Sequence, residues 1–530
     1  MNDADFLLSQ LRNRKISRRA FIAKMTALGA GGLMSLQMTG KALAQTPVKG
    51  GHLRFAMGHG STSDTLDPGK VLNGFLSSTH YAITNTLTEV DASGILVPKL
   101  AESWDASADA TQWTFKLRKG VEFHDGRTLN ADDVIASINH HRGENSTSSA
   151  KTMVDPIVEI SADGDRVKFV LSGGDADFPF KLSSFNFPIY QANPNGSLNW
   201  KSRIGTGGYV LKDFDPGVRA SFERNPNYWQ GDRAHFASGE LLTIADSTAR
   251  QTALTTGTVD AIDRVDLKTA SLLQRVPGIV LEEVAGKTHY TFPMHTNVAP
   301  FDDVNVRMAL KLAFDREEML KKILYGYGSI GNDQPISAAY PFFNAELEQR
   351  VYDPEQAKFY LKKAGLSKLE VELSAADAAF PGAVDAAVLF GEYAKKAGIS
   401  VTVRREPNDG YWSNVWMKKP FVACYWPGYP TVDSILTQAY AAGGSWNDTF
   451  FENEKFNKLL LAARSELDST RRAQMYGEMQ QILRDQGGVI LPFFANDVFA
   501  TSDKIGHGAL SSNYDVDGRM YFERWWFKSA

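Results

Sequence analysis

Strand and helix signals alternate along nearly the whole chain, and this alternation limits the fold more than any other feature of the sequence. Apolar and polar residues alternate at 52–57, 113–117, 166–171 and 209–211, which is typical of half-buried strands. Helix N-terminal caps stand between them at Asn130 and Asp353, and further helices are expected to begin near Asn305 and Asn453. The pattern predicts an α/β fold.

The length of the chain predicts more than one domain. The 530 residues exceed what a single hydrophobic core usually organises, even without the first 44. We find no internal repeat, no low-complexity segment and no Gly/Ser-rich linker. The lobes are therefore expected to be joined by chain that crosses directly between them, as hinge segments do.

The first 44 residues are predicted to form a cleavable twin-arginine signal peptide. Arg18-Arg19 is followed by Phe-Ile, a lysine and an apolar run over 25–38, which is too short and too rich in glycine to span a membrane. The run leads to Ala42-Leu43-Ala44, a signal peptidase motif, so Gln45 is the expected first mature residue. The sequence predicts a soluble periplasmic protein and a twin-arginine translocase as its export partner.

Charge and cysteine content exclude several classes of function. Removal of residues 1–44 takes away seven basic and two acidic residues, which lowers the net charge from −4 to −9. An acidic surface argues against nucleic acid as a partner. Cys424 is the only cysteine, so neither a disulfide, a thiolate zinc site nor a lipidated cysteine at the cleavage site is expected.

No enzyme motif is found, and no cofactor or resident metal is expected. The chain lacks Gly-x-Ser-x-Gly, His-Glu-x-x-His and the phosphate-binding Gly-x-x-x-x-Gly-Lys. Its ten histidines show no ligand spacing. A metal carried inside an organic chelate remains an alternative solute, and an enzymatic alternative would be revealed by turnover.

Several blocks spread over some 400 residues resemble one family in both sequence and order. They are Leu100-Ala101-Glu102-Ser103-Trp104, the stretch 113–126, Ala131-Asp132-Asp133-Val134, Gly205-Thr206-Gly207-Gly208-Tyr209, the stretch 223–229, Thr256-Gly257-Thr258-Val259-Asp260, and the stretch 300–316. On these blocks the chain is identified as a member of the dipeptide, oligopeptide, nickel and opine receptors, the family 5 periplasmic solute-binding proteins of ABC importers.

The resemblance implies a two-lobed type II periplasmic binding protein with an extra third domain and a discontinuous first lobe. The first lobe would comprise 45–88, 203–290 and 495–530, the extra domain 89–202, and the second lobe 291–494. The implied function is not enzymatic. The protein would capture a small solute, such as a peptide-like molecule, an opine or a sugar conjugate, by hinge closure and would deliver it to the membrane permease.

An aromatic stretch between 409 and 447 supplies the candidate ligand-binding residues. Four of the ten tryptophans fall within 35 residues, among Gly, Pro, Asn and Asp, and aromatic side chains on loops are typical of a ligand cleft. The candidates are Tyr411, Trp412, Trp416, Trp426, Gly428, Tyr429, Asp433, Trp446 and Asn447. Trp412 and Trp416 fit a core role equally well, and Asp433 fits a turn or hinge role.

Gly428 marks a departure from the peptide-binding members of the family. They typically carry Trp-x-Gly-Asp-Tyr-Pro-Asp-Pro-Asp here, and their first Asp pairs with the α-ammonium group of a bound peptide. The matching stretch in this chain is 426–433, with Gly428 at the position of that Asp. An ammonium group buried without a counter-charge is costly, so plain dipeptides are not the expected solute.

Overall fold

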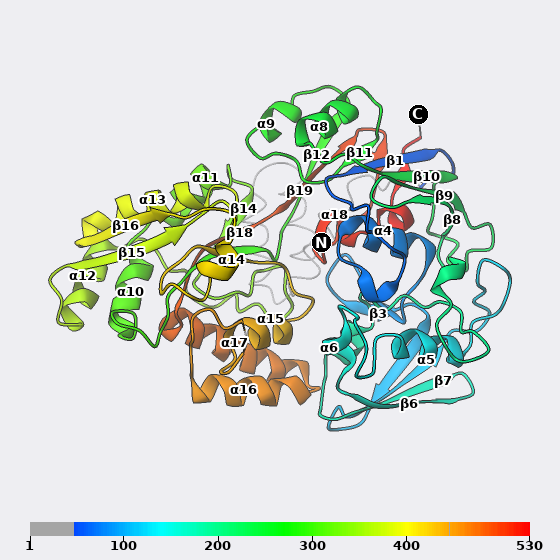
Figure 1. The fold of residues 1–530 in the computed structure, drawn as a ribbon, viewed down its shortest axis with the longest axis horizontal. Coiled ribbons are helices and arrows are strands. Elements are labelled where there is room, and N and C mark those ends of the chain that lie inside the picture. Colours follow the sequence, from blue (N-terminus) through cyan, green and yellow to red (C-terminus); the bar gives the residue numbers. More distant parts are fainter. Residues whose placement is uncertain (1–46, 445, 530) are drawn as a thin grey trace, which may run out of the picture.

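The computed structural model describes residues 47–444 and 446–529. The signal peptide predicted for residues 1–44 lies outside the described residues. Three groups of strands and helices make up the described chain, and two crossing segments join the first group to the third (Figure 1).

The first group is built on a seven-stranded sheet with the order β12-β19-β11-β1-β10-β9-β8. Its strands are β1 (His52–Met57), β8 (Tyr209–Asp215), β9 (Arg219–Arg224), β10 (Ser238–Thr243), β11 (Ala261–Ile262), β12 (Ile279–Val284) and β19 (Asp497–Ser502). The central strand β1 pairs in parallel with both β10 and β11, whereas β19 is antiparallel to both of its neighbours. Three segments distant in sequence therefore share one sheet.

Short helices and two pairs of strands lie around this sheet. They are η1 (Pro68–Lys70), α4 (Gly74–Ile83), α8 (Ser247–Thr255), α9 (Ala270–Leu273), the turns α18 (Asp515–Gly518) and α19 (Tyr521–Arg524), and the pairs β2 (Thr88–Val90) with β3 (Leu96–Pro98) and β20 (Ile505–Gly506) with β21 (Trp526–Phe527). Helix α4 begins where the Asn73 side chain accepts a hydrogen bond from the Leu76 amide. Phe55 stacks on Tyr521 in the core, with 4.3 Å between ring centroids.

The second group is a four-stranded antiparallel sheet with its own core, inserted between β3 and β8. It comprises β4 (Ala101–Ala106), β5 (Gln112–Leu117), β6 (Ile157–Asp163), β7 (Arg166–Leu171), α5 (Ala131–Asn139), α6 (Lys151–Val154), α7 (Phe178–Lys181) and η2 (Trp200–Ser202). Asn130 and Asp133 form a reciprocal capping box at the start of α5, as the sequence predicts. The alternation in β5 buries Trp113, Phe115 and Leu117.

The third group holds a four-stranded sheet of order β14-β18-β13-β17 and a parallel pair, β15 with β16. The strands are β13 (His289–Pro293), β14 (Gly328–Ile330), β15 (Leu369–Ala375), β16 (Ile399–Arg405), β17 (Cys424–Trp426) and β18 (Val489–Ala495). The helices are α10 (Val304–Leu312), α11 (Arg316–Ile323), α12 (Pro354–Lys363), α13 (Ala383–Ala394), η3 (Lys395–Ala397), α14 (Tyr411–Asn414), α15 (Val432–Tyr440), α16 (Glu454–Ser465) and α17 (Ser469–Gln486). In Figure 1 this group lies on the left and the other two lie on the right.

The chain passes between the first and third groups at two places, from β12 to β13 and from β18 to β19. Both crossings are short, and they lie side by side because the Ala495 amide donates to the Thr288 carbonyl at 2.9 Å. Gly286 allows the close approach, since a Cβ atom there would lie 1.9 Å from the Ala495 carbonyl oxygen. The Ser337 hydroxyl also holds this segment through the Gly286 carbonyl, at 3.1 Å.

Candidate functional site

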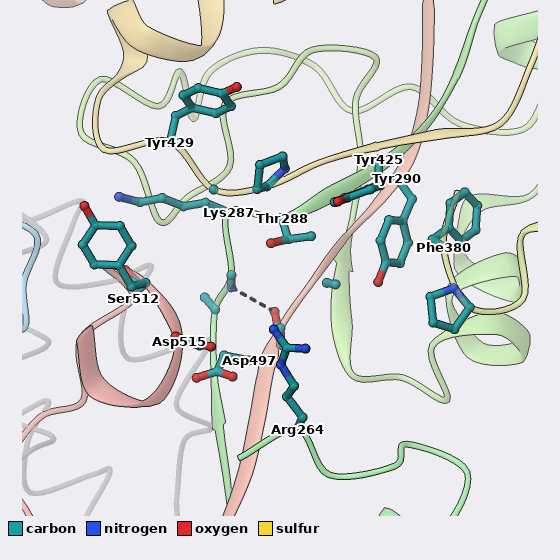
Figure 2. A pocket seen from close by; sticks show the side chains of 18 of the residues that line it. Arg264, Lys287, Thr288, Tyr290, Phe380, Tyr425, Tyr429, Asp497, Ser512 and Asp515 are labelled. Carbon is teal, nitrogen blue, oxygen red and sulfur yellow. Dashed lines mark hydrogen bonds between the residues drawn. The ribbon is translucent and has the colours of Figure 1, made fainter. Parts of the chain in front are cut away.

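A cavity of about 810 Å³ opens beside the two crossings, and we call it the interlobe pocket. The first group contributes Leu72, Arg264, Asp497, residues 512–515 and Arg519. The crossings contribute residues 285–288, 495 and 496, and the third group contributes Tyr290, residues 377–381, Tyr425 and residues 427–429. A molecule in this pocket therefore touches both groups and the segments that join them (Figure 2).

Tyrosine and phenylalanine rings form an apolar side of the pocket. Tyr290 stacks on Phe380 with 4.3 Å between ring centroids and 5° between planes. Tyr425 is the cross-strand partner of Tyr290 in the pairing of β13 with β17, so the two rings share one face of the sheet. The exposed Trp412 packs against the outer side of Tyr425, with 5.6 Å between ring centroids.

The first group contributes a network of charged residues at the pocket. Arg519 pairs with Asp515, and Arg264 lies 4.0 Å from Asp263. Burial opposes the ionisation of Asp515, but the Arg519 guanidinium holds its pKa below the ordinary value. Burial, with the negative charge of Asp515, raises the pKa of Asp497 to about 7. The carboxylates of this network thus share the two arginines of the pocket.

Lys287 stands apart from that network. It lies on the β12–β13 crossing, its residue is only 7% exposed, and its Nζ lies 4.7 Å from the centre of the Tyr340 ring. Burial lowers the pKa of Lys287 to about 8. Gly428 lies directly against it, since a Cβ atom at Gly428 would come within 2.8 Å of the Lys287 Cβ.

The structure brings two of the nine predicted ligand-binding residues, Gly428 and Tyr429, to the wall of the interlobe pocket. The Tyr429 amide donates to the Tyr340 hydroxyl at 2.9 Å, which fixes the loop after β17. Tyr340 therefore contacts both the loop after β17, through its hydroxyl, and the pocket residue Lys287, through its ring.

Trp416 and Trp426 lie behind this wall, next to the buried carboxylate of Asp448. Trp426 is 3% exposed and packs in a core cluster with Tyr340 and Val432. Half-buried Trp416 donates its Nε1 hydrogen to Asp448 at 3.1 Å, and burial raises the pKa of Asp448 to about 6. Trp412 and Trp446 are 40% and 48% exposed and do not line the pocket.

The other three predicted residues make contacts within the protein. Tyr411 is buried, and its hydroxyl donates to the Ala423 carbonyl at 2.8 Å. Asp433 accepts a hydrogen bond from the Arg464 side chain at 3.2 Å. Asn447 donates to the carbonyls of Ala441 and Phe451 and closes the loop between α15 and α16.

Lys287, Tyr290 and Tyr425 are pocket residues that the sequence reasoning did not single out. A signal for Tyr425 exists, because alternation in the strand Cys424–Trp426 puts Tyr425 on the opposite face from Trp426. For Lys287 the sequence holds no such signal, since its burial depends on residues from other segments.

Neither a membrane-crossing helix nor a cluster of metal ligands occurs in the described residues. Within 47–444 and 446–529, no helix combines the length and the apolarity that a membrane crossing requires. The same residues contain no group of three or more His, Cys, Asp or Glu side chains placed to hold a metal ion.

Comparison with known proteins identifies the family. The model of the bacterial extracellular solute-binding proteins, family 5, matches residues 96–448. Heme-binding protein A of Haemophilus influenzae is 26% identical over 73% of this chain and 77% of its own length. Di/tripeptide-binding protein 2 of Pseudomonas aeruginosa is 28% identical over 79% of this chain and 85% of its own length.

The solved structure of HbpA2 from Haemophilus parasuis superposes with a TM-score of 0.81 at 21% identity, covering 90% of this chain and all of that one. This likeness confirms the predicted two-lobed α/β fold, in which the first and third groups are the lobes and the second group is the extra domain. The chain belongs to the bacterial extracellular solute-binding proteins of family 5, the substrate-binding proteins of ABC importers.

Proposed function

We propose that the interlobe pocket is the solute site of this receptor and that the crossings at 285–288 and 495–496 act as its hinge. The observation that carries the proposal is that both lobes and both crossings line the same cavity. A solute shifts a conformational equilibrium only if it interacts differently with the two states, and contact with both lobes provides that difference. The closed form would be the one that the membrane permease recognises.

The proposed lobe boundaries are those expected from the sequence, 45–88, 203–290 and 495–530 for the first lobe, 89–202 for the extra domain and 291–494 for the second lobe, except that the β2–β3 hairpin lies with the first group, so we propose that the extra domain begins after Pro98. Among the predicted site residues, we propose that Gly428 and Tyr429 contact the solute, together with Tyr425. Trp412 is proposed to support Tyr425 through their ring contact, and Trp416, Trp426 and Trp446 are proposed to form an aromatic cluster beside it.

The site favours a solute without a free α-amine. Gly428 supplies no carboxylate, and Lys287 occupies the space that a side chain at 428 would need. A charged amine placed there would meet an ammonium group instead of its counter-ion, which is unfavourable in a partly buried site. Peptides with a blocked amine, opines and sugar conjugates meet this requirement, whereas unmodified di- and tripeptides do not.

Native mass spectrometry of protein taken from the periplasm without refolding tests the proposal, because a closed receptor often retains its solute. Calorimetric titration with unmodified di- and tripeptides completes the test. We expect a retained solute and weak peptide binding. Submicromolar binding of unmodified dipeptides would contradict the amine argument.

The protein is proposed to bind without chemical turnover, so the solute should be recovered unchanged after incubation. Metal analysis of the purified complex separates a chelated metal from an organic solute. A product that accumulates with time would favour an enzyme instead.

We propose export through the twin-arginine translocase with cleavage after Ala44, on the strength of Arg18-Arg19 and the small residues at 42–44. Replacing both arginines by lysine should leave the precursor in the cytoplasm. Unchanged export of that variant would show that another route is used.

A further inference from the structure

Three lysines are buried in the part of the chain that the structure describes, and two of them have oxygen partners. Lys99 lies between two carboxylates, with its Nζ 2.8 Å from Glu89 and 2.7 Å from Glu523. Lys311 donates to the carbonyl oxygens of Leu483 and Arg484, at 3.2 and 2.9 Å. In both cases the fold itself compensates the buried charge.

Lys287 has no such compensation. Among the described residues, no carboxylate lies within 4.0 Å of its Nζ and no oxygen accepts a hydrogen bond from it, and the Nζ lies 4.7 Å from the centre of the Tyr340 ring. An ammonium group on a largely buried side chain without a counter-charge is costly. Lys287 differs from the other two buried lysines in one further respect, because it lines the interlobe pocket.

The two arginines of the pocket lie near carboxylates of the first group, and Arg264 is exposed to solvent. Arg519 pairs with Asp515, and Arg264 lies 4.0 Å from Asp263. Figure 2 shows Arg264, Asp497 and Asp515 together in the lower part of the view, whereas Lys287 lies above them near Tyr429. Lys287 is therefore the buried cation of the pocket that has no carboxylate beside it among the described residues.

The other residues of the pocket indicate the chemistry of the remaining part of a solute that contacts Lys287. Tyr290, Phe380 and Tyr425 gather on the side opposite the Lys287 ammonium (Figure 2). Their rings offer apolar contact area at a low cost in conformational entropy. A cavity of about 810 Å³ holds an organic molecule with both an apolar part and a charged part.

We infer that the interlobe pocket selects an organic acid, whose acidic group pairs with the Lys287 ammonium while its apolar body contacts Tyr290, Phe380 and Tyr425. The acidic group is a carboxylate or a phosphate, because a lysine binds either as a compact point charge with three donors. This inference rests on the proposed function, since it names the class of solute that the same pocket takes.

The test is calorimetric titration with N-acetyl-tyrosyl-alanine, its C-terminal amide and phenyl phosphate. The first two probes share a blocked amine and an aromatic ring and differ only in the acidic group. We expect the wild-type protein to bind an acidic probe at least about tenfold more tightly than the amide, as a charge-assisted hydrogen bond provides. Tighter binding of phenyl phosphate than of N-acetyl-tyrosyl-alanine would identify phosphate, rather than carboxylate, as the acidic group that the pocket selects.

Lys287→Met should remove the preference for the acid, whereas Lys268→Met should keep it, because Lys268 is exposed and away from the pocket. The melting temperature of Lys287→Met should equal or exceed that of the wild type, since the substitution leaves no carboxylate without its partner. A lower melting temperature would show that the lysine has a structural role and would overturn the inference.

Equal affinity for acid and amide, or no saturable binding of either acidic probe, would also overturn the inference. These outcomes are distinguishable from failure of the proposed function. If protein from the periplasm carries a solute that is not acidic, the inference alone fails. If it carries no solute and binds no probe, the proposed function fails as well.

Discussion

Lys99 and Lys287 show how the same residue type takes opposite energetic roles. Lys99 ties Glu89 to Glu523 and thus joins the hairpin β2–β3 to the C-terminal turn α19. Its removal takes one cation from two buried carboxylates that keep Arg233, and it should cost about 1.5 to 3 kcal/mol of unfolding free energy. Lys287 has no such partner among the described residues, and natural binding sites often keep residues of this kind at the expense of stability.

The pH dependence of stability should reveal this cost. The pKa of Lys287 is about 8 in the folded protein and 10.5 ordinarily, so between these values the unfolded chain binds the extra proton. The free energy of unfolding therefore rises with pH between about pH 8 and pH 10.5, because the unfolded chain binds more protons in that range. The destabilisation caused by burying the charged Lys287 is fully present below pH 8 and is gone near pH 10.5. It amounts to roughly 3 kcal/mol at most.

Urea unfolding of the wild type and of Lys287→Met at neutral and alkaline pH measures this effect. The variant should be the more stable protein at pH 7, and the difference should shrink as the pH approaches about 10.5. Lys99→Met is the matched control and should be less stable than the wild type at pH 7. A difference for Lys287→Met that does not change with pH would contradict the assignment.

Strand β17 distributes its side chains between pocket and core. Tyr425 is exposed at the pocket, whereas its neighbours Cys424 and Trp426 are buried. Tyr425→Ala should weaken binding of N-acetyl-tyrosyl-alanine by more than about 1 kcal/mol with little loss of stability. Trp426→Ala should instead lower the unfolding free energy by about 3 to 5 kcal/mol, because it empties a packed volume.

Calorimetry and thermal unfolding of both variants separate the two roles. Trp446→Ala is the control for an exposed aromatic residue off the pocket, and it should change neither quantity appreciably. If Trp426→Ala folds with unchanged stability and loses binding, the tryptophan belongs to the solute site, as the sequence suggested.

Helices and strands were predictable from the sequence where side-chain caps or the alternation of apolar and polar residues determine them. The strand expected at 52–57 is β1, and the helices expected to begin near Asn130 and Asp353 are α5 and α12, each started by a side-chain cap. The pocket was harder to predict from the sequence, because its walls come from distant segments near 264, 286, 379, 427 and 514. The aromatic stretch at 409–447 contains residues of the pocket wall, and alternation puts Tyr425 and Trp426 on opposite faces, but only the structure shows which face is buried.

The crossing segments should tolerate no side chain at Gly286. A Cβ atom there would lie 1.9 Å from the Ala495 carbonyl oxygen, so Gly286→Ala must push the two crossings apart. We expect a loss of stability of about 1 to 3 kcal/mol, typical of overpacking. Gly231→Ala is the matched control, because a Cβ atom at Gly231 would meet no other atom within 4 Å and the φ of this residue is not left-handed. Equal melting temperatures for the two variants would contradict the close approach.

At the scale of the whole molecule, the first lobe is assembled from three separate parts of the sequence. Strand β19 returns from the end of the chain to pair with β11 and β12, and no local pattern predicts that pairing. The family resemblance implied only that 495–530 belongs to the first lobe, and length and alternation alone predicted only several α/β lobes. The same return places the second crossing beside the first and creates the pocket between the lobes.

This arrangement predicts that solute binding compacts the molecule. Because the pocket walls belong to both lobes, a solute gains contacts when the lobes approach, and at 100 times its Kd it should stabilise the protein by about 2.7 kcal/mol. Small-angle X-ray scattering should therefore show a smaller radius of gyration with saturating N-acetyl-tyrosyl-alanine, and the melting temperature should rise in parallel. Tyr425→Ala should require more probe for the same compaction, because the second lobe then offers less contact. A raised melting temperature at an unchanged radius of gyration would mean that the probe binds without moving the lobes, and the hinge proposal would then be wrong even though the pocket is the binding site.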